Sequence, residues 1–203
     1  MKEDIEKLGK STLYSEELGI KLGNKDDELF KWFLASTLFG GRISETIAKN
    51  TYKAFGDHNL LTPESIMEAG FDFLVNPIMR EGGYVRYDGR ESTQILRNCK
   101  FLLDRYKGSL SSIHDQSSDC RDLEKRLAEF YGVGPVTVNI FLRELRPHWE
   151  KADPEPLSFV YEMADELGID LESYRSDPEI FSRVECGLVR MRGERQHKQK
   201  KKK

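Results

Sequence analysis

Cysteine is scarce in this sequence, and long hydrophobic runs are missing. Its 203 residues include three cysteines, Cys99, Cys120 and Cys186, which lie far apart. An odd number of distant cysteines without a C-x-x-C pair excludes a disulfide framework and indicates a reducing compartment. No segment approaches the roughly 18 consecutive apolar residues of a membrane helix, so no membrane association is expected. The charged start MKEDIEKLGK lacks the apolar stretch of a secretory signal, which predicts a cytoplasmic protein.

An excess of positive charge is missing as well. The formal net charge is -3, from 32 Lys and Arg against 35 Asp and Glu. Residues 195–203 hold six of these basic residues, so the rest of the chain is more acidic than the total suggests. Any contact with nucleic acid must therefore come from a local patch, from backbone dipoles or from this tail. We predict one domain over residues 1–192 and a disordered basic tail over 193–203.

Helical periodicity dominates the pattern, and long alternating strand patterns are missing. Apolar residues recur at helical spacing over 26–39 and over 90–107, where Gly108 ends the segment. Helix starts are expected at Ser44, at Thr62-Pro63 and at Asp177-Pro178, and the last helix is expected to end near Arg190. The segment SSIHDQSSD (111–119) is predicted to be a polar loop. The fold class is therefore predicted to be an all-α bundle of roughly ten short helices.

The most informative stretch is DLEKRLAEFYGVGPVTVNIFLRELR, residues 122–146. Apolar residues mark one face of a first helix and one face of a second, and a Gly-Val-Gly-Pro turn joins them. Glycines permit positive φ and the close approach of another backbone, and Pro135 suits the first position of a helix. The backbone amides expected to bind a phosphate oxygen are those of Gly132, Gly134, Val136 and Thr137. Taken alone, a tight turn without a ligand explains this pattern equally well.

An acidic residue follows the hairpin in the segment WEKADP, residues 149–154. Pro154 is suited to open a helix, so we expect Asp153 to be the N-cap of that helix, partly buried and close to the hairpin. An Asp-Pro cap is structural in most proteins. A catalytic role for Asp153 therefore needs support from other motifs in the sequence.

Five segments of the chain form an ordered series of motifs. They are LFKWFLASTLFGGRISETIAKNTYKAF, LTPESIMEAG, GGYVRYDGRESTQILRNCKFLLDRYKGSL, LAEFYGVGPVTVNIFLREL and ADPEPLSFV. In order and approximate spacing they resemble the endonuclease III and helix-hairpin-helix DNA glycosylase superfamily, over about residues 26–170. The resemblance implies two small helical lobes with a cleft between them. It also implies that Asp153 is the catalytic carboxylate, since ADPEPLSFV is similar to the family's V-D-T-H segment.

Departures from the family pattern indicate the subtype. Val136 occupies the position of the nucleophilic lysine of bifunctional members, and it cannot form a Schiff base. Only Cys186 lies where many members carry four cysteines, so we expect no iron-sulfur cluster and no other metal cofactor. A monovalent cation held by hairpin carbonyls stays open. The resemblance thus implies a monofunctional glycosylase, a nucleoid-associated monomer that acts on lesions in double-stranded DNA.

Such an enzyme must take its target base out of the duplex and into a pocket. As the N-glycosidic bond breaks, the sugar gains positive charge, which a nearby carboxylate stabilises. The pocket is expected to be aromatic, because stacking holds a flipped base. The candidates for the pocket or for the wedge that fills the gap in the duplex are Phe39, Arg42, Tyr84, Tyr87 and Trp149. Each aromatic candidate is also suited to a core position.

Two other functions stay open. The acidic composition, and the Pro-Glu-Pro that follows Asp153, also suit a non-catalytic helix-hairpin-helix protein that binds DNA or recognises damage. A bifunctional glycosylase and lyase that uses Lys151 is the other alternative, although a plain surface lysine explains Lys151 as well. The sequence leaves the lesion open among alkylated purines, oxidised guanine and mismatched pyrimidines.

Overall fold

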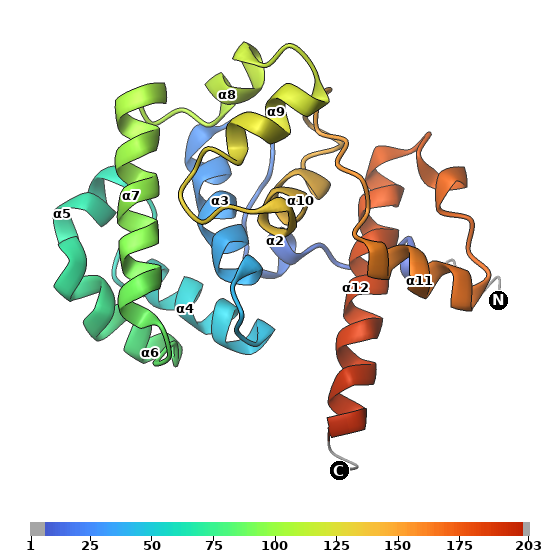
Figure 1. Cartoon of the computed structure of the whole chain (residues 1–203), viewed down its shortest axis with the longest axis horizontal. Coiled ribbons are helices and arrows are strands. Elements are labelled where there is room, and N and C mark those ends of the chain that lie inside the picture. Colours follow the sequence, from blue (N-terminus) through green and yellow to red (C-terminus); the bar gives the residue numbers. More distant parts are fainter. Residues whose placement is uncertain (1–6, 201–203) are drawn as a thin grey trace. The chain divides into compact units, whose positions relative to one another are not determined.

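The structure, a computed structural model, describes residues 7–200, with side chains described as far as residue 195 (Figure 1). Every regular element in this range is a helix and no strand occurs in it, which confirms the predicted all-α class. The elements are α2 (Tyr14–Glu17), α3 (Asp26–Gly40), α4 (Glu45–Asp57), α5 (Pro63–Phe73), the π-helix η1 (Leu74–Met79), α6 (Arg80–Gly82), α7 (Asp88–Tyr106), α8 (Ser111–Gln116), α9 (Cys120–Leu127), α10 (Pro135–Arg143), α11 (Ser158–Leu167), the 3-10 helix η2 (Leu171–Tyr174) and α12 (Pro178–Lys200). Among the described residues, none of these helices combines the length and the apolar character needed to cross a membrane.

The chain divides into two compact units, which are described separately. The larger unit is the continuous segment Ile20–Pro154, and the smaller unit joins the described residues up to Gly19 with those from Glu155 onward. The stretch 1–192, predicted to be one domain, therefore contains parts of both units. The cleft expected between two lobes stays a prediction.

Helix α3 forms the centre of the larger unit, and its predicted apolar stripe is confirmed. The Phe33 ring lies 4.9 Å from that of Phe130 and 5.5 Å from that of Phe141, measured between centroids. The Trp32 indole donates a hydrogen bond to the Phe141 carbonyl at 3.0 Å. Figure 1 shows α3 beside α10, and these contacts attach the hairpin to the core of the unit.

Helices α5 and α7 pack against each other on one flank of α3 (Figure 1). The predicted cap of α5 is present, since the Thr62 hydroxyl accepts a hydrogen bond from the amide of Ser65 at 3.1 Å. Gly70 interrupts this helix with a φ of 75°. Helix α7 agrees with the predicted segment 90–107, and its apolar stripe, which includes Ile95 and Leu102, is buried.

The loop predicted over 111–119 is wrong in its first half, which forms α8. The Ser111 amide at its start donates to the carboxylate of Asp26 at 2.8 Å, and Ile113 is fully buried. A carboxylate from a distant segment thus satisfies an amide that a short polar helix leaves free. Local sequence contains no sign of this partner.

Helix α12 begins at Pro178, as predicted, and continues to Lys200, past the end expected near Arg190. Lys, Arg, Gln and Glu fill this stretch and are good helix formers, and Gly193 alone does not stop the helix. The segment 193–203, predicted to be a disordered tail, therefore begins as part of α12. Residues 201–203 lie outside the described residues.

The smaller unit has its own apolar core, in which Leu8 packs with residues of α11 and α12. A Cβ atom at Gly187 would lie 2.5 Å from a methyl of Leu8, so α12 needs a glycine where the N-terminal segment crosses it. The Arg183 guanidinium pairs with the Glu16 carboxylate at 2.6 Å and lowers the pKa of Glu16. These contacts attach the two ends of the chain to each other within one unit.

Candidate active site

The predicted hairpin is present in the larger unit as α9, a short turn and α10. The Asp119 carboxylate caps α9 by accepting a hydrogen bond from the Asp122 amide at 2.9 Å. In the turn, Gly132 has a φ of 72°, a left-handed conformation that favours glycine. Gly134 has a φ of -104°, which any residue can adopt, so only one of the two glycines is needed for its backbone conformation.

The start of α10 has no side-chain cap, and of the two residues after Pro135, Val136 is exposed and Thr137 is buried. Pro135 is the first residue of the helix, as predicted. The first backbone hydrogen bond here runs from the Val138 amide to the Gly134 carbonyl at 3.0 Å, which leaves the amides of Val136 and Thr137 without acceptors inside the helix. Val136 is 47% exposed. Free amides and the positive end of the helix dipole suit an anion.

The prediction that Asp153 caps a helix opened by Pro154 is wrong. Residues 152–157 have no regular structure, and α11 begins only at Ser158. Pro156 explains the difference, because the residue before a proline avoids the helical conformation and because proline lacks the amide that an Asp153 cap would bind at this position. Asp153 is also exposed, not partly buried as predicted.

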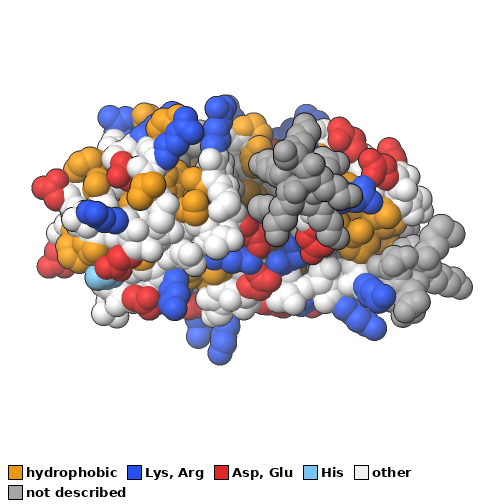
Figure 2. Space-filling model, turned by 90° about the horizontal axis from the view of Figure 1, so that it is seen from below, with side chains coloured by type: hydrophobic (Ala, Val, Ile, Leu, Met, Phe, Trp, Pro, Cys, Tyr) orange, Lys and Arg blue, Asp and Glu red, His pale blue; other side chains and the backbone are white. Residues whose placement is uncertain are grey.

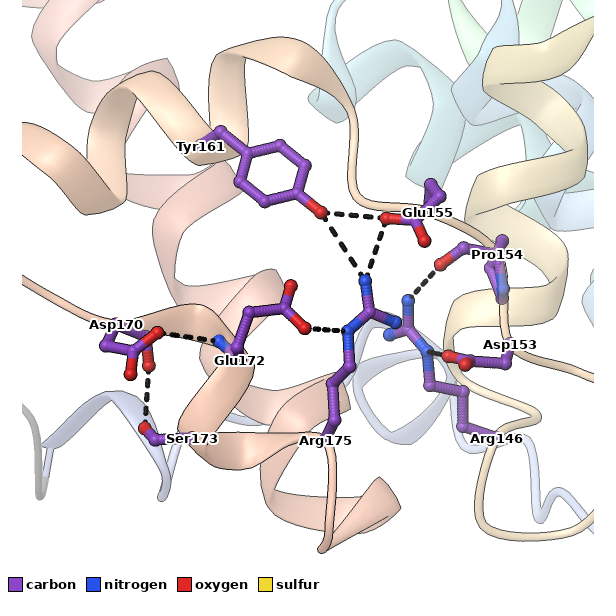
Figure 3. Close-up of polar contacts among 9 residues, drawn as sticks. All are labelled: Arg146, Asp153, Pro154, Glu155, Tyr161, Asp170, Glu172, Ser173 and Arg175. Atoms are coloured by element: carbon purple, nitrogen blue, oxygen red, sulfur yellow. Dashed lines mark hydrogen bonds and ion pairs between the residues drawn. The ribbon is translucent and has the colours of Figure 1, made fainter.

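Asp153 is held by a buried cation instead. The Arg146 Nε atom donates to the Asp153 carboxylate at 3.2 Å, and the same guanidinium donates to the carbonyl of Pro154 (Figure 3). The side chain of Arg146 is 2% exposed and that of Asp153 is 51% exposed. The guanidinium therefore orients a carboxylate that solvent or a ligand can reach, and it offsets part of the carboxylate's charge.

Figure 3 also draws a separate network that belongs to the smaller unit. The Arg175 guanidinium pairs with Glu155 at 2.8 Å and with Glu172 at 2.6 Å, and the Tyr161 hydroxyl donates to Glu155 at 2.8 Å. These groups attach the segment before α11 to η2. Their charges are paired with one another, which fits a structural role.

A cavity of about 390 Å³ lies in the larger unit, beside the hairpin. Its lining residues are Thr37, Gly40, Gly41, Arg42, Tyr84, Tyr87, Arg90, Glu91, Gln94, Gly132 and Thr137. They come from the end of α3, the turn before α7, the first turns of α7, and the hairpin. Five predicted site residues are thus brought together, namely Arg42, Tyr84, Tyr87, Gly132 and Thr137.

Five other predicted residues do not line this cavity, namely Phe39, Gly134, Val136, Trp149 and Asp153. Trp149 is 2% exposed, and its ring stacks on His114 at 4.9 Å and meets Phe141 edge-on at 5.9 Å, so it belongs to the core. Phe39 is half-buried, with its ring 6.4 Å from that of Trp32. Trp149 therefore has the core position that the sequence left open for each aromatic candidate.

The cavity contains a carboxyl group that sequence reasoning missed. Glu91 is 7% exposed, and its Oε2 atom accepts a hydrogen bond from the Tyr84 hydroxyl at 2.9 Å. Its Oε1 atom is buried and has no hydrogen-bond partner in the described structure. Burial raises the pKa of Glu91, while the Tyr84 hydrogen bond and the charge of Arg90 oppose that rise. Burial also raises the pKa of Tyr84.

A pattern in the sequence could have revealed Glu91. Glu91 lies four residues before Ile95 and eight residues before Cys99, so all three share one face of α7. Ile95 and Cys99 are each 2% exposed. An acidic residue on the apolar stripe of a helix is rarely buried without a reason. Ile95 is the first apolar residue of the predicted segment 90–107, so a stripe defined by apolar residues alone leaves Glu91 outside it.

Two basic side chains of the larger unit, Arg97 and Lys151, make specific contacts. Figure 2 shows Lys and Arg interspersed with Asp and Glu over the face that it draws. On the larger unit, the Arg97 guanidinium lies 4.5 Å from the ring centroid of the exposed Tyr131, next to the glycine turn. Lys151 donates from its amine to the His114 carbonyl at 2.8 Å.

No group of three or more His, Cys, Asp or Glu side chains within the described residues is arranged to hold a metal ion. Comparisons with known proteins found no matching family model, no matching curated protein and no matching solved structure. The functional assignment therefore depends on the hairpin, the cavity and the carboxylates.

Proposed function

We propose that this chain is a monofunctional DNA glycosylase that flips a damaged or mismatched base and hydrolyses its N-glycosidic bond. One observation carries the proposal: the cavity shares Gly132 and Thr137 with a hairpin whose helix start has no side-chain cap. A volume of about 390 Å³ lies in the range of small-ligand pockets. A site for a base beside a site for backbone phosphate is what an enzyme needs to hold a nucleotide outside the duplex.

Base binding and catalysis at the sugar are assigned to different groups. The cavity holds the base, and the exposed carboxylate of Asp153 acts on the sugar. Asp153 therefore does not need to line the cavity. The carboxylate stabilises the positive charge that develops on the sugar and orients or deprotonates the attacking water. Arg146 is a positioning residue, because its buried guanidinium fixes the orientation of that carboxylate.

A covalent route has little support. The position expected of a nucleophilic lysine holds Val136, whose side chain has no amine. Lys151 is the alternative amine, and it donates a hydrogen bond to a backbone carbonyl. An amine that attacks the sugar would first have to leave this carbonyl. The expected product is therefore an intact abasic strand.

A second candidate function is a non-catalytic protein that recognises damaged DNA. The ion pair between Arg146 and Asp153 favours it, because a cation beside the carboxylate offsets the charge that catalysis uses. Both candidates predict binding to lesion-bearing DNA. Only the glycosylase releases a base.

The test is incubation of the full chain with a panel of labelled duplexes that carry alkylated purines, oxidised guanine or mismatched pyrimidines. The glycosylase predicts strand cleavage on a sizing gel only after alkali. Binding without cleavage on any duplex would favour the recognition protein. Sodium borohydride trapping on the cognate lesion separates the lyase, since a stoichiometric complex that disappears in Lys151→Ala would contradict the monofunctional proposal.

A further inference from the structure

The Oε1 atom of Glu91 is the unusual feature of the cavity. It belongs to a side chain that is more than nine-tenths buried and whose residue lines the cavity, and the atom has no hydrogen-bond partner in the described structure. The other oxygen of the carboxyl group is satisfied by Tyr84. A buried polar atom without a partner costs free energy, so such atoms are rare unless a ligand or water completes them.

The surroundings of Glu91 suit a planar ligand. Tyr87 is 57% exposed, lines the cavity, and has a left-handed backbone with a φ of 67°. Its ring lies under the Arg86 guanidinium, 5.0 Å from the ring centroid. An exposed aromatic ring at a cavity wall offers a face on which a heterocycle can stack. Gln94 adds an amide, with one donor group and one acceptor group, to the same wall.

We propose that the cavity selects nucleobases that carry an exocyclic amino group, with Glu91 Oε1 as the acceptor for that amine. The inference deepens the proposed function and rests on it, since it assigns a substrate class to the same cavity. Adenine, cytosine and guanine each carry an amino group that donates hydrogen bonds. In uracil and thymine the one ring N–H of the pairing edge lies between two carbonyl oxygens, which repel a carboxylate.

The size of the preference follows from the kind of hydrogen bond. Hydrogen bonds to charged groups are stronger than those between neutral groups, and a carboxylate facing carbonyl oxygens loses the bond and also meets repulsion. A preference of about tenfold or more is therefore expected for amino-bearing bases over diketo bases. Glu91 is a specificity-determining residue in this scheme, and Asp153 keeps the role at the sugar.

Free nucleosides test the inference without DNA and without any bond cleavage. The probes are 2′-deoxyadenosine and 2′-deoxycytidine, compared with thymidine and 2′-deoxyuridine, each titrated into the full chain. Amide chemical shifts of Gly40 and Gly132, which line the cavity, report binding. The wild type is expected to bind the amino-bearing pair about tenfold or more tightly.

Two variants of Glu91 and one control complete the design. Glu91→Gln is nearly isosteric and removes the charge, and it should reduce the preference to within about twofold. Glu91→Asp keeps the charge but withdraws the oxygen from the cavity, and it should reduce the preference as well, which covers a failure of the first variant to fold. The control is Glu68→Gln on the exposed face of α5, which changes the net charge equally and should retain the preference.

Equal binding of all four nucleosides by the wild type would overturn the inference, and so would a preference that survives in both Glu91 variants. The outcome is separable from that of the proposed function. A chain that prefers amino-bearing nucleosides but never releases a base would lose the glycosylase proposal and keep the ligand class. A chain that excises bases without the preference would lose only the inference about Glu91.

Discussion

Asp153 and Glu91 are two carboxyl groups of the same unit in opposite surroundings. Asp153 is half exposed, lies in an extended segment and pairs with a buried guanidinium. Glu91 is buried in the first turns of a helix, and its one hydrogen-bond partner is a phenol. Asp153 was identified by the order of motifs along the chain, and Glu91 by its burial in the structure. Motif order and burial are therefore independent sources of candidate residues.

Under the proposed function, the two carboxyl groups have different tasks. An exposed, oriented carboxylate can face a cation that develops on the sugar. A buried carboxyl with an unpartnered oxygen is better suited to recognise a ligand than to stabilise a full charge. Each of the following variants tests one side of this contrast.

The largest effect is expected for Asp153→Asn. The amide keeps the shape and loses the negative charge, so base release should fall about 100-fold or more, the order seen when one electrostatic stabiliser is removed. Single-turnover base release on the duplex found in the panel measures this, and DNA affinity should stay within a few-fold. Asp153 caps no helix, so the melting temperature should hardly change.

The matched control is Glu150→Gln, an exposed acid near Asp153 that lines no part of the cavity. It should leave base release unchanged. Full activity of Asp153→Asn would remove the main support for the catalytic assignment. Loss of folding in that variant would show that Asp153 stabilises the fold through Arg146.

A comparison of Gly132→Ala with Gly134→Ala separates stability from binding in the hairpin. At Gly132 the backbone φ is 72°, and a Cβ atom would lie 2.1 Å from the Gln94 side chain, so alanine should cost about 1–3 kcal/mol. At Gly134 a Cβ atom meets nothing within 4 Å, so stability should stay the same. Urea unfolding measures both.

DNA binding of the same pair tests the phosphate site. Gly134→Ala should weaken binding to duplex DNA in fluorescence anisotropy, because the added methyl group lies where a phosphate would approach the uncapped start of α10. Unchanged affinity in this fully folded variant would favour the tight turn without a ligand.

A smaller change in the free energy of unfolding, with a definite sign, is expected for Glu91→Gln as pH changes. Burial raises the pKa of Glu91 in the folded state, so its contribution to stability is fully present below the ordinary pKa of glutamate and is lost as pH rises through the folded value. Glutamine does not titrate. The variant should therefore gain stability relative to the wild type as pH rises above the ordinary pKa of glutamate, measured by urea unfolding.

Glu16→Gln in the smaller unit provides the opposite case. The hydrogen bond from Arg183 lowers the pKa of Glu16, so its contribution is present above the ordinary pKa and is lost as pH falls. This variant should lose stability relative to the wild type at pH 8 and recover as the pH falls below the ordinary pKa of glutamate. Differences of the same sign for both variants would contradict the burial argument for Glu91.

The smallest effect concerns the basic residues at the end of the chain. A truncation after Gly193 removes six basic residues and should flatten the dependence of DNA affinity on salt, because each neutralised phosphate contributes about -0.9 to the slope of log affinity against log salt. The preference among lesions should not change. An unchanged slope would mean that these residues do not contact DNA.

Helix positions in this protein follow from local patterns. Apolar spacing located α3 and α7, Thr62 located the start of α5, and Pro135 located the start of α10. These signals act within a few residues of chain, through caps, fixed φ angles and a shared apolar face. The error at Pro154 was also local, since Pro156 stands in the same short segment and excludes a helix start.

Several features of the site needed the tertiary structure. The start of α8 depends on Asp26, which lies far away in the chain, and the orientation of Asp153 depends on a guanidinium that is buried only when the unit folds. Glu91 is enclosed because the first turns of α7 come together with the end of α3 and with the hairpin around one cavity. The sequence by itself located the helices whose caps and apolar faces lie within a few residues of one another, such as α3, α5, α7 and α10, whereas α8 needed a partner from a distant segment. Only the tertiary structure decided which polar groups lose their water, because desolvation depends on neighbours that are distant in the chain.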